Sequence, residues 1–150
     1  MSVLALLRRT RTIAIVGASA NPSRASYFVA TYLRADAPEY TVWYVNPRET
    51  EIAGQSVFAT LDDLPEVPDM VDVFRRTDDL PSVVAEAVAV GASSLWFQLG
   101  LVHDEAAATA EAAGLTVVQD KCLKIEHARF KGGLHTAGFD TGVISSKRRL

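Results

Sequence analysis

The apolar and polar positions of the chain follow two patterns. Short runs of apolar and β-branched residues predict strands at residues 12–16, 41–45, 70–74, 95–97 and 115–118. Apolar residues at helical spacing predict helices at 27–33, 83–90 and 106–113. Strands that are apolar on both faces and alternate with helices are typical of a parallel sheet covered on both sides. The pattern therefore predicts an α/β fold that is Rossmann-like, with a doubly wound, mostly parallel, five-stranded sheet.

The segments outside this pattern set the limits of the domain. Residues 3–7 are apolar and predict a short N-terminal helix, far below the ~20 residues that a membrane span needs. Residues 55–69 lack a full helical pattern, so we expect only one capped turn between the second and third predicted strands. The chain is expected to form one domain over residues 1–150, with a core at about 10–127 and a tail at 128–150.

A glycine turn directly follows the first predicted strand. Gly17 ends the apolar run, and Ser19 lies where a helix is about to begin. A strand that feeds a helix in this way aims backbone N–H groups and the positive end of the helix dipole at one point, which suits a phosphate. The turn lacks the G-x-G-x-x-G fingerprint of common dinucleotide sites, because Ser19 and Pro22 replace its later glycines.

Arginines gather at the predicted ligand-binding edge. In a doubly wound sheet, the segments that follow the strands meet where the strand order reverses. These segments bring in Arg24, Arg48, Arg75 and Arg76, whose planar guanidinium groups suit a ligand with several phosphates. The alternative is that these side chains are solvated or paired with helix carboxylates.

The end of the second predicted strand argues against NAD. An acidic residue usually stands there and binds the adenosine ribose, whereas this chain reads Asn46-Pro47-Arg48. This composition tolerates an extra phosphate on the ribose, as in NADP or coenzyme A. The alternative for Asn46 and Pro47 is an ordinary turn at the end of a strand.

The composition favours a small-molecule ligand. A net charge of −3 gives no bulk attraction to nucleic acid or to an anionic membrane, so neither is expected as a partner. The single cysteine, Cys122, excludes an internal disulfide and a cysteine-rich metal site. A reducing, cytoplasmic location is therefore expected, and a homodimer stays open.

Several short motifs together resemble a known family. They are residues 15–19 (IVGAS), 45–47 (VNP), 71–75 (VDVFR), 95–100 (LWFQLG) and the turn from Asp120 to Cys122. In this order and spacing, over about residues 10–127, they resemble the small stand-alone coenzyme A-binding proteins related to the CoA-binding domain of the succinyl-CoA synthetase α subunit.

The resemblance implies a cofactor, coenzyme A or an acyl-CoA. Residues 17–24 would hold its pyrophosphate, Arg48 or its neighbours the adenosine phosphate, and residues 74–76 and 98–100 the adenine and pantetheine. The residues expected to bind it are Gly17, Ala18, Ser19, Asn21, Arg24, Asn46, Pro47, Arg48, Phe74, Arg75, Arg76, Gln98, Leu99, Gly100 and Cys122.

No catalytic residue or metal ligand is predicted. The sequence ends at Leu150 without the phosphohistidine or ATP-grasp domains of a ligase, so the resemblance implies binding without ligase chemistry. His103, His127 and His135 lack metal-ligand spacing and are expected in turn, packing or solvated positions. Cys122 either approaches the thiol of the cofactor, with exchange chemistry, or is an idle small residue. An NADP-dependent oxidoreductase, a non-catalytic subunit of an acyl-CoA ligase, and a protein-interaction domain without a ligand stay open as alternatives.

Overall fold

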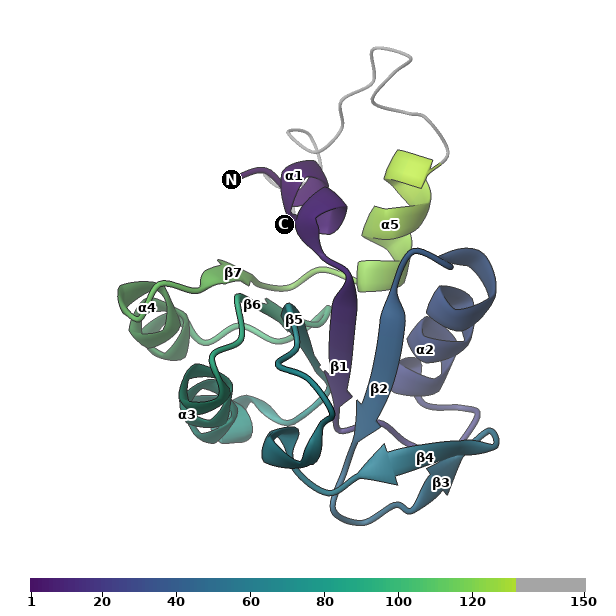
Figure 1. The fold of residues 1–150 in the computed structure, drawn as a ribbon. Helices are drawn as coiled ribbons and strands as arrows, with labels where there is room; N and C mark the ends of the chain where they lie inside the picture. Colours follow the sequence, from purple (N-terminus) through teal and green to yellow (C-terminus); the bar gives the residue numbers. More distant parts are fainter. Residues whose placement is uncertain (132–150) are drawn as a thin grey trace.

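A computed structural model gives the fold of this chain and describes residues 1–131 (Figure 1). Strands and helices alternate as the sequence pattern predicts, and the fold is a Rossmann-like α/β sandwich. The helices are α1 (Val3–Arg9), α2 (Ala25–Asp36), α3 (Leu80–Val90), α4 (Asp104–Ala112) and α5 (Leu123–Lys131), with 3-10 turns η1 (Leu61–Asp63) and η2 (Thr77–Asp79). The strands are β1 (Thr12–Val16), β2 (Thr41–Val45), β3 (Glu51–Ile52), β4 (Gln55–Phe58), β5 (Met70–Val73), β6 (Ser94–Phe97) and β7 (Thr116–Val118).

The sheet has seven strands in the order β3-β4-β2-β1-β5-β6-β7. All neighbouring strands are parallel except β3 and β4, which pair antiparallel. The five predicted strands correspond to β2, β1, β5, β6 and β7, so the predicted strand number of five is too low by the β3–β4 hairpin. The chain order reverses between β1 and β5, where β1 lies between β2 and β5.

The β3–β4 hairpin escapes the sequence pattern because its strands are short and carry few apolar residues, although Ile52 is buried in the core. Its paired residues are Glu51 with Ser56 and Ile52 with Gln55, which leaves a two-residue turn. Both turn residues have positive φ, 49° at Ala53 and 81° at Gly54, as the tight turn of a twisted hairpin requires. Asn-Gly or Asp-Gly would have signalled such a turn, and Ala-Gly does not.

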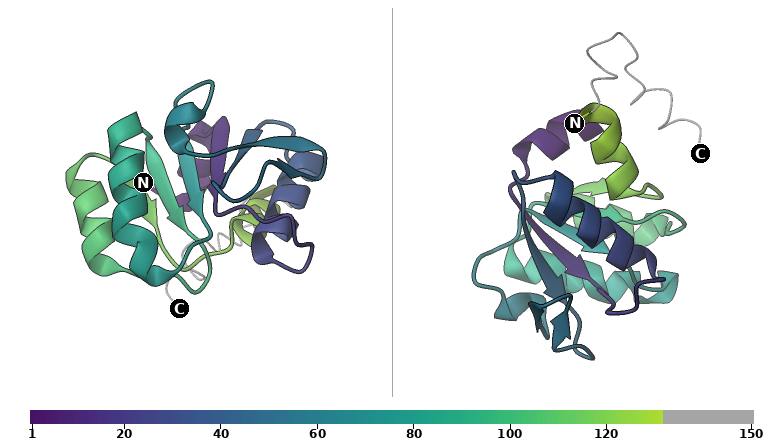
Figure 2. Two further views of the ribbon diagram at one scale, coloured as in Figure 1. Left: turned by 90° about the horizontal axis from the view of Figure 1, so that it is seen from below. Right: turned by 90° about the vertical axis from the view of Figure 1, so that its right-hand side faces the viewer.

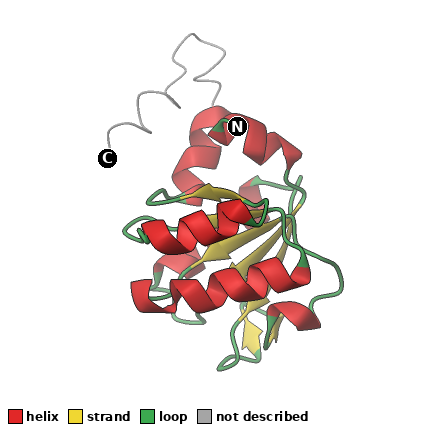
Figure 3. Ribbon diagram, turned by 90° about the vertical axis from the view of Figure 1, so that its left-hand side faces the viewer, coloured by secondary structure: helices red, strands yellow, loops and turns green. Residues whose placement is uncertain are grey.

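Two apolar cores lie on opposite faces of the sheet, and helices cover both faces (Figure 2). The β1 residues Ile13 and Ile15 pack with α1, α2 and α5 on one face. The alternate β1 residues Ala14 and Val16 pack with α3 and α4 on the other face, where these two helices lie side by side (Figure 3). This alternation along a single strand is the two-sided burial that a continuously apolar parallel strand predicts.

The segments at the ends of the chain show one agreement and one difference. The short N-terminal helix is present as α1, capped by the Ser2 hydroxyl, which accepts from the Ala5 N–H at 3.1 Å. The predicted core ended near residue 127, but α5 continues to Lys131 and buries Phe130. The rest of the predicted tail lies outside the described residues. Among residues 1–131, no helix combines the length and the apolarity needed to cross a membrane.

Candidate functional site

A crevice of about 510 Å³ opens at the carboxyl ends of the strands. It lies beside β1, where the strand order reverses, at the lower edge of the sheet in Figure 1. The loops after β1, β2, β5 and β6 form its walls, together with the start of α2. Its lining residues are Gly17, Ser19, Arg24, Ala25, Ser26, Asn46, Arg48, Glu49, Phe74, Arg75, Gln98, Leu99 and Leu101.

Gly17 is required by the protein backbone at this point. Its φ is +86°, a conformation that side chains strongly disfavour. A Cβ atom at this position would lie 2.1 Å from the carbonyl oxygen of Phe74, the residue that follows β5. The glycine therefore lets the β1 and β5 loops approach each other, and this contact forms the floor of the crevice.

The loop after β1 satisfies many of its own N–H groups. Four of these groups, at Ser19, Ala20, Asn21 and Ser23, donate to side-chain oxygens at 3.0–3.1 Å. The acceptors are, in the same order, Ser26 Oγ, Glu49 Oε2, Ser19 Oγ and Asn21 Oδ1. The expected cradle of free N–H groups within this loop is therefore not what the structure shows.

Backbone N–H groups that are available to a ligand lie further along the chain, at the start of α2. Arg24 is the N-cap residue and makes no side-chain capping bond. The N–H groups of Ala25 and Ser26, in the first turn, have no acceptor within the described part of the chain, and both residues line the crevice. Exposed first-turn N–H groups and the helix dipole favour an anion at this place.

Three of the four predicted arginines line the crevice around this helix terminus. Arg24, Arg48 and Arg75 line it, whereas Arg76 is exposed and lies outside the lining. Arg75 also forms an ion pair of 3.4 Å with Asp79, and both side chains are partly exposed. An exposed pair of this kind contributes at most about 1 kcal/mol and can be exchanged for a ligand phosphate at little cost. The crevice is thus positively charged in a chain whose net charge is −3.

Asn46 and Glu49 join the turn after β2 to the loop after β1. The Asn46 amide nitrogen donates to the Ala18 carbonyl at 2.8 Å, and its amide oxygen accepts from the Arg48 N–H at 2.9 Å. The Glu49 carboxylate accepts from the Ala20 N–H at 3.1 Å. Sequence reasoning missed Glu49, because it sought an acid at the end of the second strand and not four residues beyond it.

Comparison with known proteins places this chain in a family. The family model described as a CoA binding domain matches residues 11–128. The chain belongs to the CoA-binding domain family. It is 37% identical over 123 residues to the uncharacterized protein YneT of Bacillus subtilis (strain 168), covering 82% of this chain and 90% of that protein.

Solved structures of two related proteins share the fold of this chain. A hypothetical protein from Pyrococcus horikoshii OT3 superposes with a TM-score of 0.81 at 34% identity, covering 86% of this chain and 89% of that one. Cell-free ID.343 from Thermus thermophilus superposes with a TM-score of 0.78 at 39% identity, covering 85% and 95%. The predicted family resemblance and the predicted fold class are therefore confirmed.

The structure brings nine of the predicted binding residues to the crevice of this CoA-binding domain. They are Gly17, Ser19, Arg24, Asn46, Arg48, Phe74, Arg75, Gln98 and Leu99. The other predicted residues lie outside its lining, namely Ala18, Asn21, Pro47, Arg76, Gly100 and Cys122.

The non-lining residues have structural surroundings of their own. Ala18 is buried in the core, and the Gly100 N–H donates to Asp120 Oδ1 at 2.7 Å. Cys122 is a free, half-buried cysteine that packs against the core beside α2 and α5. Leu99, by contrast, lines the crevice with 64% of its surface exposed, so it offers the ligand an apolar contact.

One buried carboxyl group lies beneath the crevice floor. Asp72 on β5 is fully buried between Ile15 and Trp96 of the neighbouring strands, two residues before Phe74 and on the same face. Neither of its oxygens has a hydrogen-bond partner within the described residues. Burial raises the pKa of Asp72 well above the usual range, so the neutral acid is the form the fold favours.

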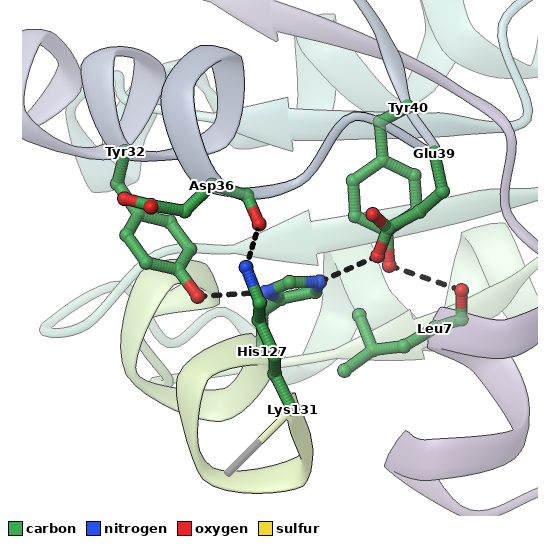
Figure 4. Close-up of polar contacts among 7 residues, drawn as sticks. All are labelled: Leu7, Tyr32, Asp36, Glu39, Tyr40, His127 and Lys131. Carbon is green, nitrogen blue, oxygen red and sulfur yellow. Dashed lines mark hydrogen bonds and ion pairs between the residues drawn. The ribbon is translucent and has the colours of Figure 1, made fainter.

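A second polar cluster lies at the opposite end of the sheet, around His127 of α5 (Figure 4). Its Nδ1 lies 2.8 Å from the Tyr32 hydroxyl, and its Nε2 lies 2.7 Å from the Glu39 carboxylate. The Tyr40 hydroxyl donates to the Leu7 carbonyl, and Lys131 donates to the Asp36 carbonyl. His127 is buried, so its packing role is confirmed.

His103 is the other histidine within the described residues. His103 caps α4, since its ring nitrogen accepts from the Ala106 N–H at 3.1 Å, as expected for a residue of a local turn. His135 lies outside the described residues. Within residues 1–131, no group of three or more histidine, cysteine or acidic side chains is arranged to hold a metal ion.

Proposed function

We propose that this protein binds coenzyme A or an acyl-CoA in the crevice beside β1 and carries out no chemistry on it. The observation that supports the proposal is the joint presence of the α2 N-terminus and three arginines in one crevice of a CoA-binding domain. Coenzyme A is a polyanion with a long, mostly apolar arm, and this crevice offers both positive charge and apolar surface.

Under this proposal, the polar residues of the crevice bind the phosphates of the ligand, and its apolar residues contact the adenine and the pantetheine arm. Arg24, with the N–H groups of Ala25 and Ser26, would bind the pyrophosphate, while Arg48 and Arg75 would bind the phosphate on the ribose. Phe74 and Leu99 would contact the adenine and the pantetheine arm. Charge-assisted hydrogen bonds from arginine are the strongest contacts in this set, so they should dominate the affinity.

We also propose where in the cell this binding takes place. The single, unpaired Cys122 suits a reducing compartment, so we place the binding role in the cytoplasm. A homodimer, which the sequence leaves open, would be tested by size-exclusion chromatography with light scattering. The ligand alone, however, defines the function proposed here.

A parallel titration tests the proposal. Isothermal titration calorimetry and thermal-shift assays would compare CoA, acetyl-CoA, NADP, NAD and ATP at one salt concentration. We expect CoA and acetyl-CoA to bind, and binding of NADP alone would favour the oxidoreductase alternative. A ligand at ~100 times its dissociation constant should raise the unfolding free energy by about 2.7 kcal/mol.

Two arginine variants locate the site. Arg24→Ala and Arg75→Ala should each weaken CoA binding by roughly tenfold or more, because each removes a charge-assisted contact worth about 1.5–3 kcal/mol. Arg9→Ala is the matched control, since Arg9 is an exposed arginine at the end of α1. Unchanged CoA affinity in the Arg24→Ala, Arg75→Ala double variant would contradict the proposed site.

A further inference from the structure

Glu49 is an acidic residue among the arginines of the crevice. It lies in the turn after β2, is half-buried and lines the crevice together with Arg24, Arg48 and Arg75. No ion pair within residues 1–131 joins Glu49 to any of these arginines. Neutralising the arginines is therefore not what holds its carboxylate in place.

The carboxylate of Glu49 instead occupies a backbone donor. One of its oxygens, Oε2, accepts from the Ala20 N–H at 3.1 Å, in the adjoining loop after β1. The turn that carries Glu49 is itself held by Asn46, which binds both the Ala18 carbonyl and the Arg48 N–H. The contact thus joins two ordered loops.

A carboxylate and a phosphate seek the same partners. Both are anions that accept hydrogen bonds from backbone N–H groups, and both are repelled by a second anion nearby. The three other loop N–H groups with side-chain acceptors donate to neutral oxygens of Ser26, Ser19 and Asn21. Of the four side-chain acceptors, Glu49 is therefore the charged one, and it comes from the turn after β2.

We propose that Glu49 takes the place of a ligand phosphate at the Ala20 N–H in the free protein and thereby weakens the binding of phosphate-bearing ligands. The inference rests on the proposed function, since it concerns the same crevice. An entering pyrophosphate displaces the carboxylate from Ala20 or binds beside it at the α2 N-terminus. Either route brings two anions close together, so Glu49 limits the affinity and favours ligands that also gain from the arginines and the apolar wall.

The test compares variants of this position with a matched charge control. Glu49→Gln removes the charge and keeps the size, and Glu49→Ala also removes the acceptor. Glu51→Gln makes the same change of net charge on the exposed strand β3, outside the crevice. Calorimetry would measure each protein with CoA, with CoA lacking its ribose phosphate, and with pantetheine, which has no phosphate.

We expect Glu49→Gln and Glu49→Ala to bind CoA roughly tenfold more tightly than the unmodified protein, a gain typical of removing one like charge a few ångströms away in a partly solvated site. The gain should be smaller for CoA without its ribose phosphate and absent for pantetheine. Glu51→Gln should bind like the unmodified protein. The amide resonance of Ala20 should shift in the Glu49→Ala variant without ligand.

Two other outcomes would overturn the inference. Weaker CoA binding by Glu49→Ala would make Glu49 an acceptor for the ligand's hydroxyl groups, and equal binding would make it a purely structural contact. Failure of the unmodified protein and of all variants to bind CoA, with circular dichroism showing them folded, would instead contradict the proposed function. The two failures are therefore distinguishable.

Discussion

The two ends of the sheet differ in whether their polar groups have partners within the protein. At the amino end, the buried His127 contacts the Tyr32 hydroxyl with one ring nitrogen and the Glu39 carboxylate with the other. At the carboxyl end, Arg24 and Arg48 form no ion pair within the described residues, and the first N–H groups of α2 face an open crevice. Hydrogen-bond donors without a protein partner are available to a ligand, as a binding site requires. Polar groups that already bind one another instead stabilise the packing of the elements that carry them.

The largest expected effect comes from the glycine at the crevice floor. Gly17→Ala forces a side chain into a positive φ and into contact with the Phe74 carbonyl. The free energy of unfolding should fall by more than about 3 kcal/mol, and CoA binding should be lost with the fold. Urea denaturation followed by circular dichroism would measure the change.

Gly54→Ala is the matched control for that substitution. Gly54 also has a positive φ of +81°, but a Cβ atom there meets nothing within 4 Å. Its cost should be limited to the backbone term of about 1–2 kcal/mol. Equal losses in the two variants would show that the approach of Phe74 does not matter.

The buried acid beneath the crevice should make stability depend on pH. Because the pKa of Asp72 is raised in the folded state, its contribution is fully present below the unfolded pKa of about 3.9 and is lost as pH rises through the folded value. The loss can reach about 1.4 kcal/mol per pH unit within this window. Urea denaturation of the unmodified protein and of Asp72→Asn, from pH 4 to 8, would measure it.

Asp72→Asn should remove this slope, since asparagine does not titrate. The variant should therefore gain stability relative to the unmodified protein as the pH increases. Parallel curves for the two proteins over the whole range would mean that Asp72 ionises normally in the folded state.

The smallest expected effect is at the amino end. Partial burial alone would raise the pKa of Glu39, but the hydrogen bond to His127, with the nearby charges of His127 and Lys131, lowers it overall. The stabilisation is present above the unfolded pKa of about 4.3 and is lost as pH falls through the folded value. Glu39→Gln should cost less than about 1 kcal/mol at pH 7, because the Glu39 side chain is 53% exposed.

Measuring CoA affinity alongside stability distinguishes the roles of the two ends of the sheet. Glu39→Gln should leave the affinity for CoA unchanged, whereas Arg75→Ala should reduce it with little loss of stability. Denaturation at pH 7 and at pH 4 gives the stability part, and calorimetry gives the affinity. A change in CoA affinity in Glu39→Gln would show that the two ends are coupled.

The fold could be predicted because its main strands are apolar on both faces. Residues 12–16 and 41–45 carry that signal over their whole length, and the structure places strands there with the same bounds. The β3–β4 hairpin could not be predicted, since its strands are short and joined by an Ala-Gly turn, even though Ile52 is buried in the core. A single buried residue in a two-residue strand leaves no periodic pattern in a sequence.

The site was predictable in its location and less so in its detail. The glycine turn and the strand ends correctly brought Arg24, Arg48 and Arg75 to one crevice. The hydrogen bonds within the loop could not be anticipated, because they depend on side chains from two other segments, Ser26 and Glu49. Long-range acceptors of this kind have no fixed spacing along a chain.

The β3–β4 hairpin also affects how readily two copies of the protein could pair at this edge of the sheet. Without it, the last two residues of β2, Tyr44 and Val45, would lie at the edge of the sheet with their outward backbone groups unpaired. With it, the outermost strand on that side is β3, which is two residues long. A two-residue outer strand gives another chain little to pair with, so the hairpin limits edge-to-edge pairing at the carboxyl end of β2.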